Sequence, residues 1–340
     1  MKRLQPTEYT YASARIRALE NRMVGRERID ILVEARSADE VMDRLAEYGL
    51  TPPDTEALTE THESGAAREA MLLSALEAAY REAETATPSP AVFRYLRYPY
   101  DCNNIKAAIK CAIRGISAAE LLFDFGTVSA DRVEALLREG NYADFPKKMA
   151  AAIPVAREAF DKTGDPRRID TILDRACYED MLDAVAATGE TTLQSWLNAR
   201  IDLTNILITL RILRMNMGAI GADFLAESLL PGGTLGGNFF AHAYEAGEEA
   251  LWSGLYRTPY GTLSRVEGEP RPLSVLERAA DDLYMEQVRK DVKIPFGAPV
   301  VAGYLLGWET AVKNIRIILA AKDAGLSPAV IRERIRLSYV

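Results

Sequence analysis

Apolar residues recur at intervals of three and four along most of this chain, which places them on one face of a helix. Alternating patterns typical of strands are scarce, and the helix-favouring residues Ala, Leu, Glu and Arg are abundant. Serine followed by glutamate three residues later predicts helix starts at Ser37, Ser117 and Ser274. Ser327, followed by proline, predicts another. Pro- and Gly-rich segments predict breaks at residues 51–64, 85–90, 231–238 and 256–272. The pattern predicts an all-α protein.

One helical motif occurs three times. Its copies begin at Asp101, Asp202 and Ala311 and contain Asn104-Ile105, Asn205-Ile206 and Asn314-Ile315. Each runs on to a glycine, where a helix commonly stops. A repeat of roughly a hundred residues has the size of a domain. We therefore expect three similar helical domains about a pseudo-threefold axis, over residues 1–120, 121–222 and 223–340. A helix over residues 9–23 lies outside the repeat and is expected to pack against the C-terminal helix.

Each copy of the motif has two distinct faces. Aliphatic residues such as Ile105, Ile109 and Ile113 predict a stripe facing the core. A different face is basic and includes Lys106, Arg211 and Arg316. The asparagines Asn104, Asn205 and Asn314 lie between the two faces. They are interpreted either as polar pins that bond to backbone groups of a neighbouring helix end, or as part of a concave surface that grips a partner. The two interpretations are compatible.

Two aspartates also belong to the motif. Asp101 and Asp202 each precede the repeated asparagine by three residues. Aspartate is a preferred N-cap, because its carboxylate accepts hydrogen bonds from the free N–H groups of a first turn. We expect each to cap the helix that follows it.

The charge of the chain restricts its partners. The formal net charge is −8, which argues against nucleic acid as the main partner and against adhesion to an anionic membrane. The apolar runs are too short to span a bilayer, and the first residues do not form a signal peptide. We expect a soluble, intracellular protein without direct membrane insertion. The three cysteines and two histidines form no metal-binding pattern, so neither a metal nor a cofactor is expected.

Catalytic motifs are largely missing from the sequence. No phosphate-binding loop or dinucleotide fingerprint occurs, and His62 and His242 have no triad spacing around them. The Gly-rich stretch over residues 230–237 follows a helix, which favours a stop and turn. Asp281 and Asp282 resemble the acidic magnesium motif of helical isoprenoid synthases. Such an enzyme remains an alternative, but the second acidic cluster that it needs is not found, and a solvated helix face explains the pair.

The order of several short motifs resembles one known family, the prokaryotic C subunit of V/A-type ATPases, which is related to the eukaryotic d subunit (AC39 family). The resemblance covers nearly the whole chain. It rests on residues 11–19, on the three Asn-Ile helices, on Leu230-Pro231-Gly232-Gly233 and on Pro295-Phe296-Gly297.

The resemblance implies an all-α, funnel-shaped, non-catalytic subunit of an ATP synthase or ATPase that transports protons or sodium ions. In that family the protein lies on the cytoplasmic face of the membrane rotor ring, peripheral to the inner face of the plasma membrane. It receives the central stalk, so its expected partners are the stalk subunits and the proteolipid ring. A generic helical adaptor is the remaining alternative.

Overall fold

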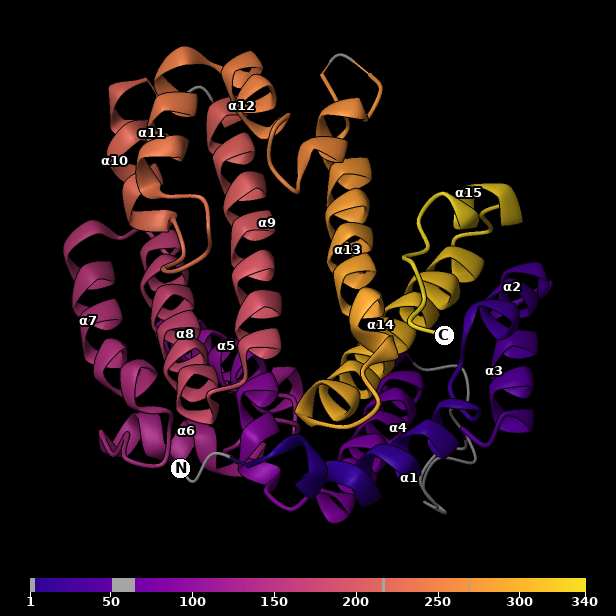
Figure 1. Cartoon of the computed structure of the whole chain (residues 1–340). Coiled ribbons are helices and arrows are strands. Elements are labelled where there is room, and N and C mark those ends of the chain that lie inside the picture. The colour runs from indigo at the N-terminus through magenta and orange to yellow at the C-terminus, as the bar shows by residue number, and fades with distance from the viewer. Residues whose placement is uncertain (1–3, 51–64, 216–217, 269) are drawn as a thin grey trace. The chain divides into compact units, whose positions relative to one another are not determined.

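The computed structural model describes residues 4–50, 65–215, 218–268 and 270–340. In these ranges the chain forms α-helices and short 3-10 helices, and no strand occurs there (Figure 1). The all-α class predicted from the helical spacing is confirmed. Of the helices described, none combines the length and apolar character that crossing a membrane requires. The predicted break over residues 51–64 lies outside the described residues.

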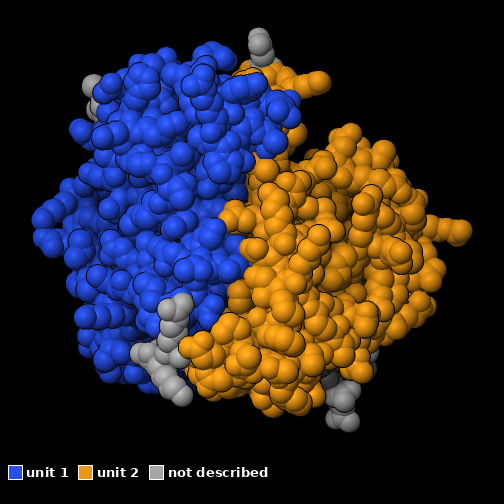
Figure 2. Space-filling model, in the orientation of Figure 1, with its two compact units in different colours: residues 1–3, 91–265 blue, residues 4–90, 266–340 orange. Residues whose placement is uncertain are grey.

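The chain folds into two compact units. One consists mainly of residues 91–265, and the other of residues 4–90 and 266–340 (Figure 2). The second unit therefore joins the two ends of the sequence. This division reflects which residues lie close together and does not test whether segments of the chain resemble one another. The three expected repeats and their boundaries therefore stay a prediction.

The unit over residues 91–265 is built around the long helices α5, α8 and α9. Helix α8 packs against α7 and α5, while α10 and α11 pack against α9. The elements are η3 (Pro90–Arg97), α5 (Tyr98–Arg114), η4 (Ala119–Leu121), α6 (Ala130–Glu139), α7 (Lys147–Thr163), α8 (Arg167–Thr188), α9 (Thr191–Met215), α10 (Ala219–Ser228), α11 (Gly237–Ala246), α12 (Glu248–Leu255) and η5 (Gly261–Arg265).

The second unit surrounds α14, which is apolar on almost every side. Most residues of α14 are buried, as expected for a central helix, and α1, α2, α3 and α4 pack against it. The elements are η1 (Pro6–Tyr9), α1 (Thr10–Glu20), α2 (Arg26–Glu34), α3 (Ala38–Glu47), α4 (Gly65–Ala86), α13 (Leu273–Lys290), η6 (Asp291–Lys293), α14 (Ala298–Asp323) and α15 (Pro328–Arg332).

Two of the four helix starts predicted at serine residues agree with the structure. Ser37 and Ser327 are N-caps whose side chains accept hydrogen bonds from the backbone three residues on, as predicted. The predictions at Ser117 and Ser274 were wrong. Ala118 is the N-cap of a 3-10 turn, and α13 begins at Leu273 after Pro272. Most of the predicted helix over residues 9–23 is realised as α1 (residues 10–20). Its predicted packing against the last of the three Asn-Ile helices, α14, is confirmed.

Candidate functional site

The three repeated asparagines make the same pair of hydrogen bonds. In each, the amide nitrogen donates to the carbonyl oxygen of one residue, and the amide oxygen accepts from the N–H of that same residue. Asn104 pairs with Phe123 at 2.8 and 2.9 Å. Asn205 pairs with Leu230 at 3.0 and 2.8 Å. Asn314 pairs with Arg336 at 2.9 Å for both bonds.

These amides are almost inaccessible to solvent. Their relative exposures are 0% for Asn104 and Asn314 and 2% for Asn205. Burying an amide is unfavourable unless its donor and acceptor are both satisfied. Here each amide also satisfies the peptide group of a chain segment that follows its helix. The arrangement holds that segment against the helix at one fixed register.

The aspartates Asp101 and Asp202 bind the same following segments. Asp101 accepts from the N–H groups of Thr127 and Val128 at 2.8 and 3.1 Å. Asp202 accepts from the N–H groups of Thr234 and Leu235, at 2.8 Å for the shorter Thr234 bond and 3.0 Å for Leu235. Both aspartates lie inside helices α5 and α9, so the prediction that they cap the helices following them was wrong.

The third copy has no aspartate at the corresponding position, and a carboxylate from another helix binds the following segment instead. Ala311 occupies the corresponding position, three residues before Asn314. Instead, Asp282 on the neighbouring helix α13 accepts a hydrogen bond from the N–H of Leu337 at 2.6 Å. Leu337 follows Arg336, the residue that Asn314 holds. In all three places an asparagine and a carboxylate therefore hold one segment together.

Burial raises the pKa of the Asp101 carboxyl above its ordinary value, although its bonds from Thr127 and Val128 lower the pKa in part. The phenol of Tyr260 donates to Asp202 at 2.8 Å, and both burial and that carboxylate raise the pKa of Tyr260. These carboxylates face backbone N–H and hydroxyl groups inside the unit. They are placed for structural hydrogen bonding.

Lys106 and Arg316 of the predicted basic face form ion pairs within the protein. Lys106 donates to Asp174 of α8 at 2.7 Å, and Arg316 donates to Glu69 of α4 at 2.9 Å. Burial by itself lowers the pKa of Lys106. Neighbouring groups, including Cys102 and Asp174, raise the pKa by more than burial lowers it, so the pKa of Lys106 lies above its ordinary value. Arg211 lies exposed on α9. Ile113, expected in the core stripe, is 46% exposed near the end of α5.

The carboxylates of the alternative magnesium motif are engaged by cations and backbone. Asp281 accepts from Lys313 at 2.5 Å and from Arg336 at 3.1 Å. Asp282 is bonded to Leu337 and lies 3.4 Å from a guanidinium nitrogen of Arg278. In the part of the chain that the structure describes, no group of three or more His, Cys, Asp and Glu residues is arranged to hold a metal ion. The geometry gives the isoprenoid-synthase alternative no support.

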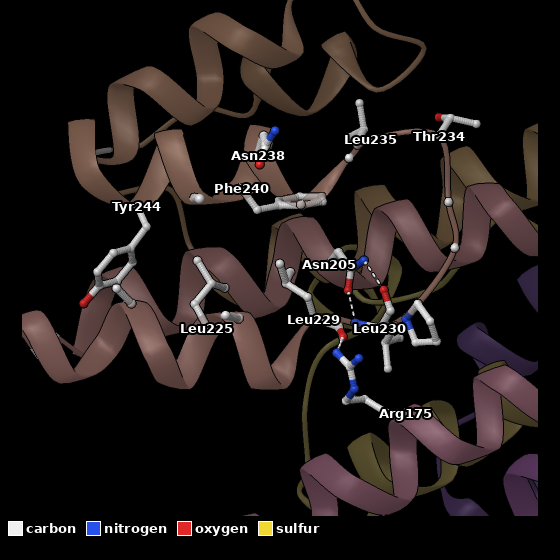
Figure 3. Close-up of a pocket in the computed structure, with 18 of the residues that line it drawn as sticks. Arg175, Asn205, Leu225, Leu229, Leu230, Thr234, Leu235, Asn238, Phe240 and Tyr244 are labelled. Carbon is white, nitrogen blue, oxygen red and sulfur yellow. Dashed lines mark hydrogen bonds between the residues drawn. The ribbon is translucent and has the colours of Figure 1, made fainter. Parts of the chain in front are cut away.

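A cavity of about 510 Å³ lies beside the pair formed by Asn205 and Leu230 (Figure 3). Its apolar lining includes Leu225, Leu229 and Phe240, drawn from α10, α11 and the segment between them. Arg175 of α8 enters from the other side and donates to the carbonyl of Leu229. Sequence reasoning missed this cavity, because it described residues 230–237 only as a turn.

The family of the chain follows from its similarity to known proteins. A family model described as ATP synthase (C/AC39) subunit matches residues 12–334, a range that includes all three asparagine helices. The chain belongs to the ATP synthase (C/AC39) subunit family. The family expected from the sequence motifs is therefore confirmed.

C subunits of ATP synthases from several organisms are similar to this chain. The C subunit of the A-type ATP synthase of Thermococcus onnurineus is 26% identical, over 96% of this chain and 90% of that protein. The corresponding A-type protein of Methanothermobacter thermautotrophicus is 25% identical, over 96% and 87%. The C subunit of the V-type ATP synthase of Thermus thermophilus is 25% identical, over 71% and 73%. The similarity thus extends to both A-type and V-type complexes.

Proposed function

We propose that this chain is a non-catalytic rotor subunit of a V/A-type ATPase or ATP synthase, and that it couples the central stalk to the membrane ring. The observation that carries the proposal is the C/AC39 family match over residues 12–334. Relatives that match over most of their length are named as the C subunit of A-type or V-type ATP synthases. The proposal places the protein on the inner face of the plasma membrane, attached through the complex.

The internal bonding supports a mechanical role. A coupling part transmits torque only if it does not deform, and close-packed helices have low compressibility. Asn104, Asn205 and Asn314 each lock a following segment to a core helix through a buried amide pair. Ion pairs such as that of Lys106 and Asp174 join neighbouring helices. We also propose that these copies mark three similar repeats, over residues 1–120, 121–222 and 223–340.

Reconstitution of the rotary complex tests the function. Complexes assembled with and without this chain are placed in lipid vesicles, and ATP hydrolysis and ion uptake are measured together. We expect hydrolysis to continue without the chain while ion uptake is lost, and addition of the purified chain to restore uptake. Ion uptake at the full rate by a complex lacking the chain would overturn the proposal.

A further inference from the structure

Two buried cysteines face each other between the long helices α5 and α8. Cys102 lies on α5 and Cys177 on α8, and each is 2% exposed. Both belong to the unit over residues 91–265. The third cysteine of the chain, Cys111, is also buried on α5. All three are free thiols.

Two ion pairs fix how α5 and α8 align. Lys106 of α5 pairs with Asp174 of α8 at 2.7 Å. Lys110, one turn further along α5, pairs with Asp170, one turn earlier on α8, at 2.5 Å. Pairs that advance along one helix while they retreat along the other belong to antiparallel helices. Moving back along α5 from Lys106 therefore corresponds to moving forward along α8 from Asp174.

The next positions in this alignment are the two cysteines. Cys102 lies four residues before Lys106, and Cys177 lies three residues after Asp174, so each is one turn away on the same face of its helix. The Cys102 thiol donates a hydrogen bond to Asp174 at 3.4 Å. It also has a hydrogen bond with the Cys177 thiol. The two thiols therefore face each other across the helix pair.

Solvent comes close to these thiols at the neighbouring ion pair. The side chain of Asp174 is 42% exposed, and that of Lys106 is 17% exposed. The sulfur of Cys102 lies one hydrogen bond away from the Asp174 carboxylate. A small oxidant that reaches this carboxylate from solvent is therefore next to Cys102.

The protonation of Cys102 sets how fast it reacts, because the thiolate is the nucleophilic form of cysteine. The hydrogen bond with Cys177 and burial raise the pKa of Cys102 well above its ordinary value, while the ammonium group of Lys106 lowers this pKa in part. The thiolate is therefore scarce at neutral pH. The reaction is slow unless the oxidant is abundant.

We infer that Cys102 and Cys177 respond to hydrogen peroxide by forming a disulfide, which joins α5 covalently to α8. Cys102 first passes its proton to Asp174, and its sulfur attacks the peroxide. The O–O bond breaks, water leaves with that proton, and a sulfenic acid remains on Cys102. The Cys177 sulfur then attacks the Cys102 sulfur and expels a second water as the S–S bond forms. The thiols lose two electrons and two protons, and the peroxide is reduced to two waters.

The disulfide would close a loop that contains α6 and α7, and it would fix two of the three long helices around which this unit is built. Such a link stabilises a fold because it restricts the unfolded chain. A dithiol reductant reverses it by thiol–disulfide exchange. The oxidised chain is thus a stiffer form of the same unit, and this inference does not depend on the proposed function.

Peptide mapping of the full chain after treatment with hydrogen peroxide tests the inference. Remaining thiols are alkylated in denaturant, and the digest is analysed by mass spectrometry before and after reduction. We expect one linked peptide pair that contains Cys102 and Cys177, an alkylated Cys111, and a raised melting temperature that dithiothreitol reverses. Oxidised methionines together with unlinked Cys102 and Cys177 would overturn the inference. A link between two chains, or one that includes Cys111, would also overturn it.

Serine variants test the pair independently of the mapping. Cys177→Ser should lose both the link and the peroxide-induced rise in melting temperature. Cys111→Ser, at the other buried cysteine of α5, is the matched control and should keep both. If Cys177→Ser kept the rise in melting temperature, the link between α5 and α8 would not be its cause. The mapping of the wild-type chain decides the inference even if a serine variant folds poorly.

The rate of cross-linking tests the step at Cys102. Lys106→Met removes the cation that favours the Cys102 thiolate and should slow the reaction by roughly threefold or more. Lys110→Met, at the next ion pair along α5, is the matched control and should react at the wild-type rate. The wild-type rate should rise with pH, because it follows the thiolate fraction. Equal rates for the two lysine variants would show that the link does not form through the Cys102 thiolate.

Discussion

Lys106 of α5 donates a hydrogen bond to Asp174 of α8 at 2.7 Å, two residues after the buried Asn104. Arg316 of α14, two residues after Asn314, makes the corresponding bond to Glu69 of α4. In the second copy this position is Leu207, so no such cation is available. The repeated helix thus combines a constant asparagine with an ion pair that only two copies retain. The asparagine and its pair of hydrogen bonds are the feature that all three copies share.

Replacing Asn205 with Ala should destabilise the unit over residues 91–265. The change leaves the N–H and carbonyl of Leu230 buried without partners, which costs about 1–3 kcal/mol. Urea unfolding followed by circular dichroism measures the loss. Asn198→Ala, at a half-buried position on the same helix, is the control and should cost less. Equal midpoints for the two variants would show that the pin contributes nothing to stability.

The fold class and the three asparagines could be predicted from the sequence, because helical periodicity and a motif repeated three times are local signals. The residues that the asparagines hold could not. Phe123, Leu230 and Arg336 lie 19, 25 and 22 residues further on and share no side-chain type, because the bonds use only their backbone. No sequence pattern therefore identifies these three residues as the ones that the asparagines bind.

The spacing of charged residues could have suggested the acidic residues that pair with the basic face, but sequence reasoning missed it. Lys106 and Lys110 are four residues apart on α5, and Asp170 and Asp174 are four apart on α8. Matching spacing on two helices allows both pairs to form, and both do, with Lys110 bound to Asp170 at 2.5 Å. The sequence could not indicate which helices become neighbours, since that is decided by packing of the whole unit.

A double-mutant cycle should detect coupling between Lys106 and Asp174. The variants are Lys106→Met, Asp174→Asn and the pair together. Because the Asp174 side chain is 42% exposed, solvent screens the pair, and we expect a coupling of about 0.5–1 kcal/mol. Unfolding midpoints of the four proteins give the value, which should fall at high salt. Additive effects of the two single changes would mean that the ion pair does not stabilise the unit.

The stability difference between the wild type and Asp101→Asn should depend on pH. The raised pKa of Asp101 means that the folded state holds its proton more tightly than the unfolded state does. Between the unfolded pKa near 3.8 and the higher folded pKa, the contribution of this group therefore falls as pH rises. Asparagine does not titrate, so the wild-type advantage should shrink through that window and then stay constant. Unfolding in urea at a series of pH values measures it, and an advantage that grows with pH would contradict the prediction.

Gly233→Ala should destabilise the protein far more than Gly237→Ala, although the two glycines are four residues apart. At Gly233 the positive φ costs a residue with a side chain about 1–3 kcal/mol, and the added Cβ would displace the Asp202 carboxylate from Thr234 and Leu235. At Gly237 the methyl group enters open space at the start of α11, where alanine favours helix. Thermal unfolding of both variants compares them directly. If both melted at the same temperature, the left-handed turn at Gly233 and its carboxylate anchor would not be what holds this segment in place.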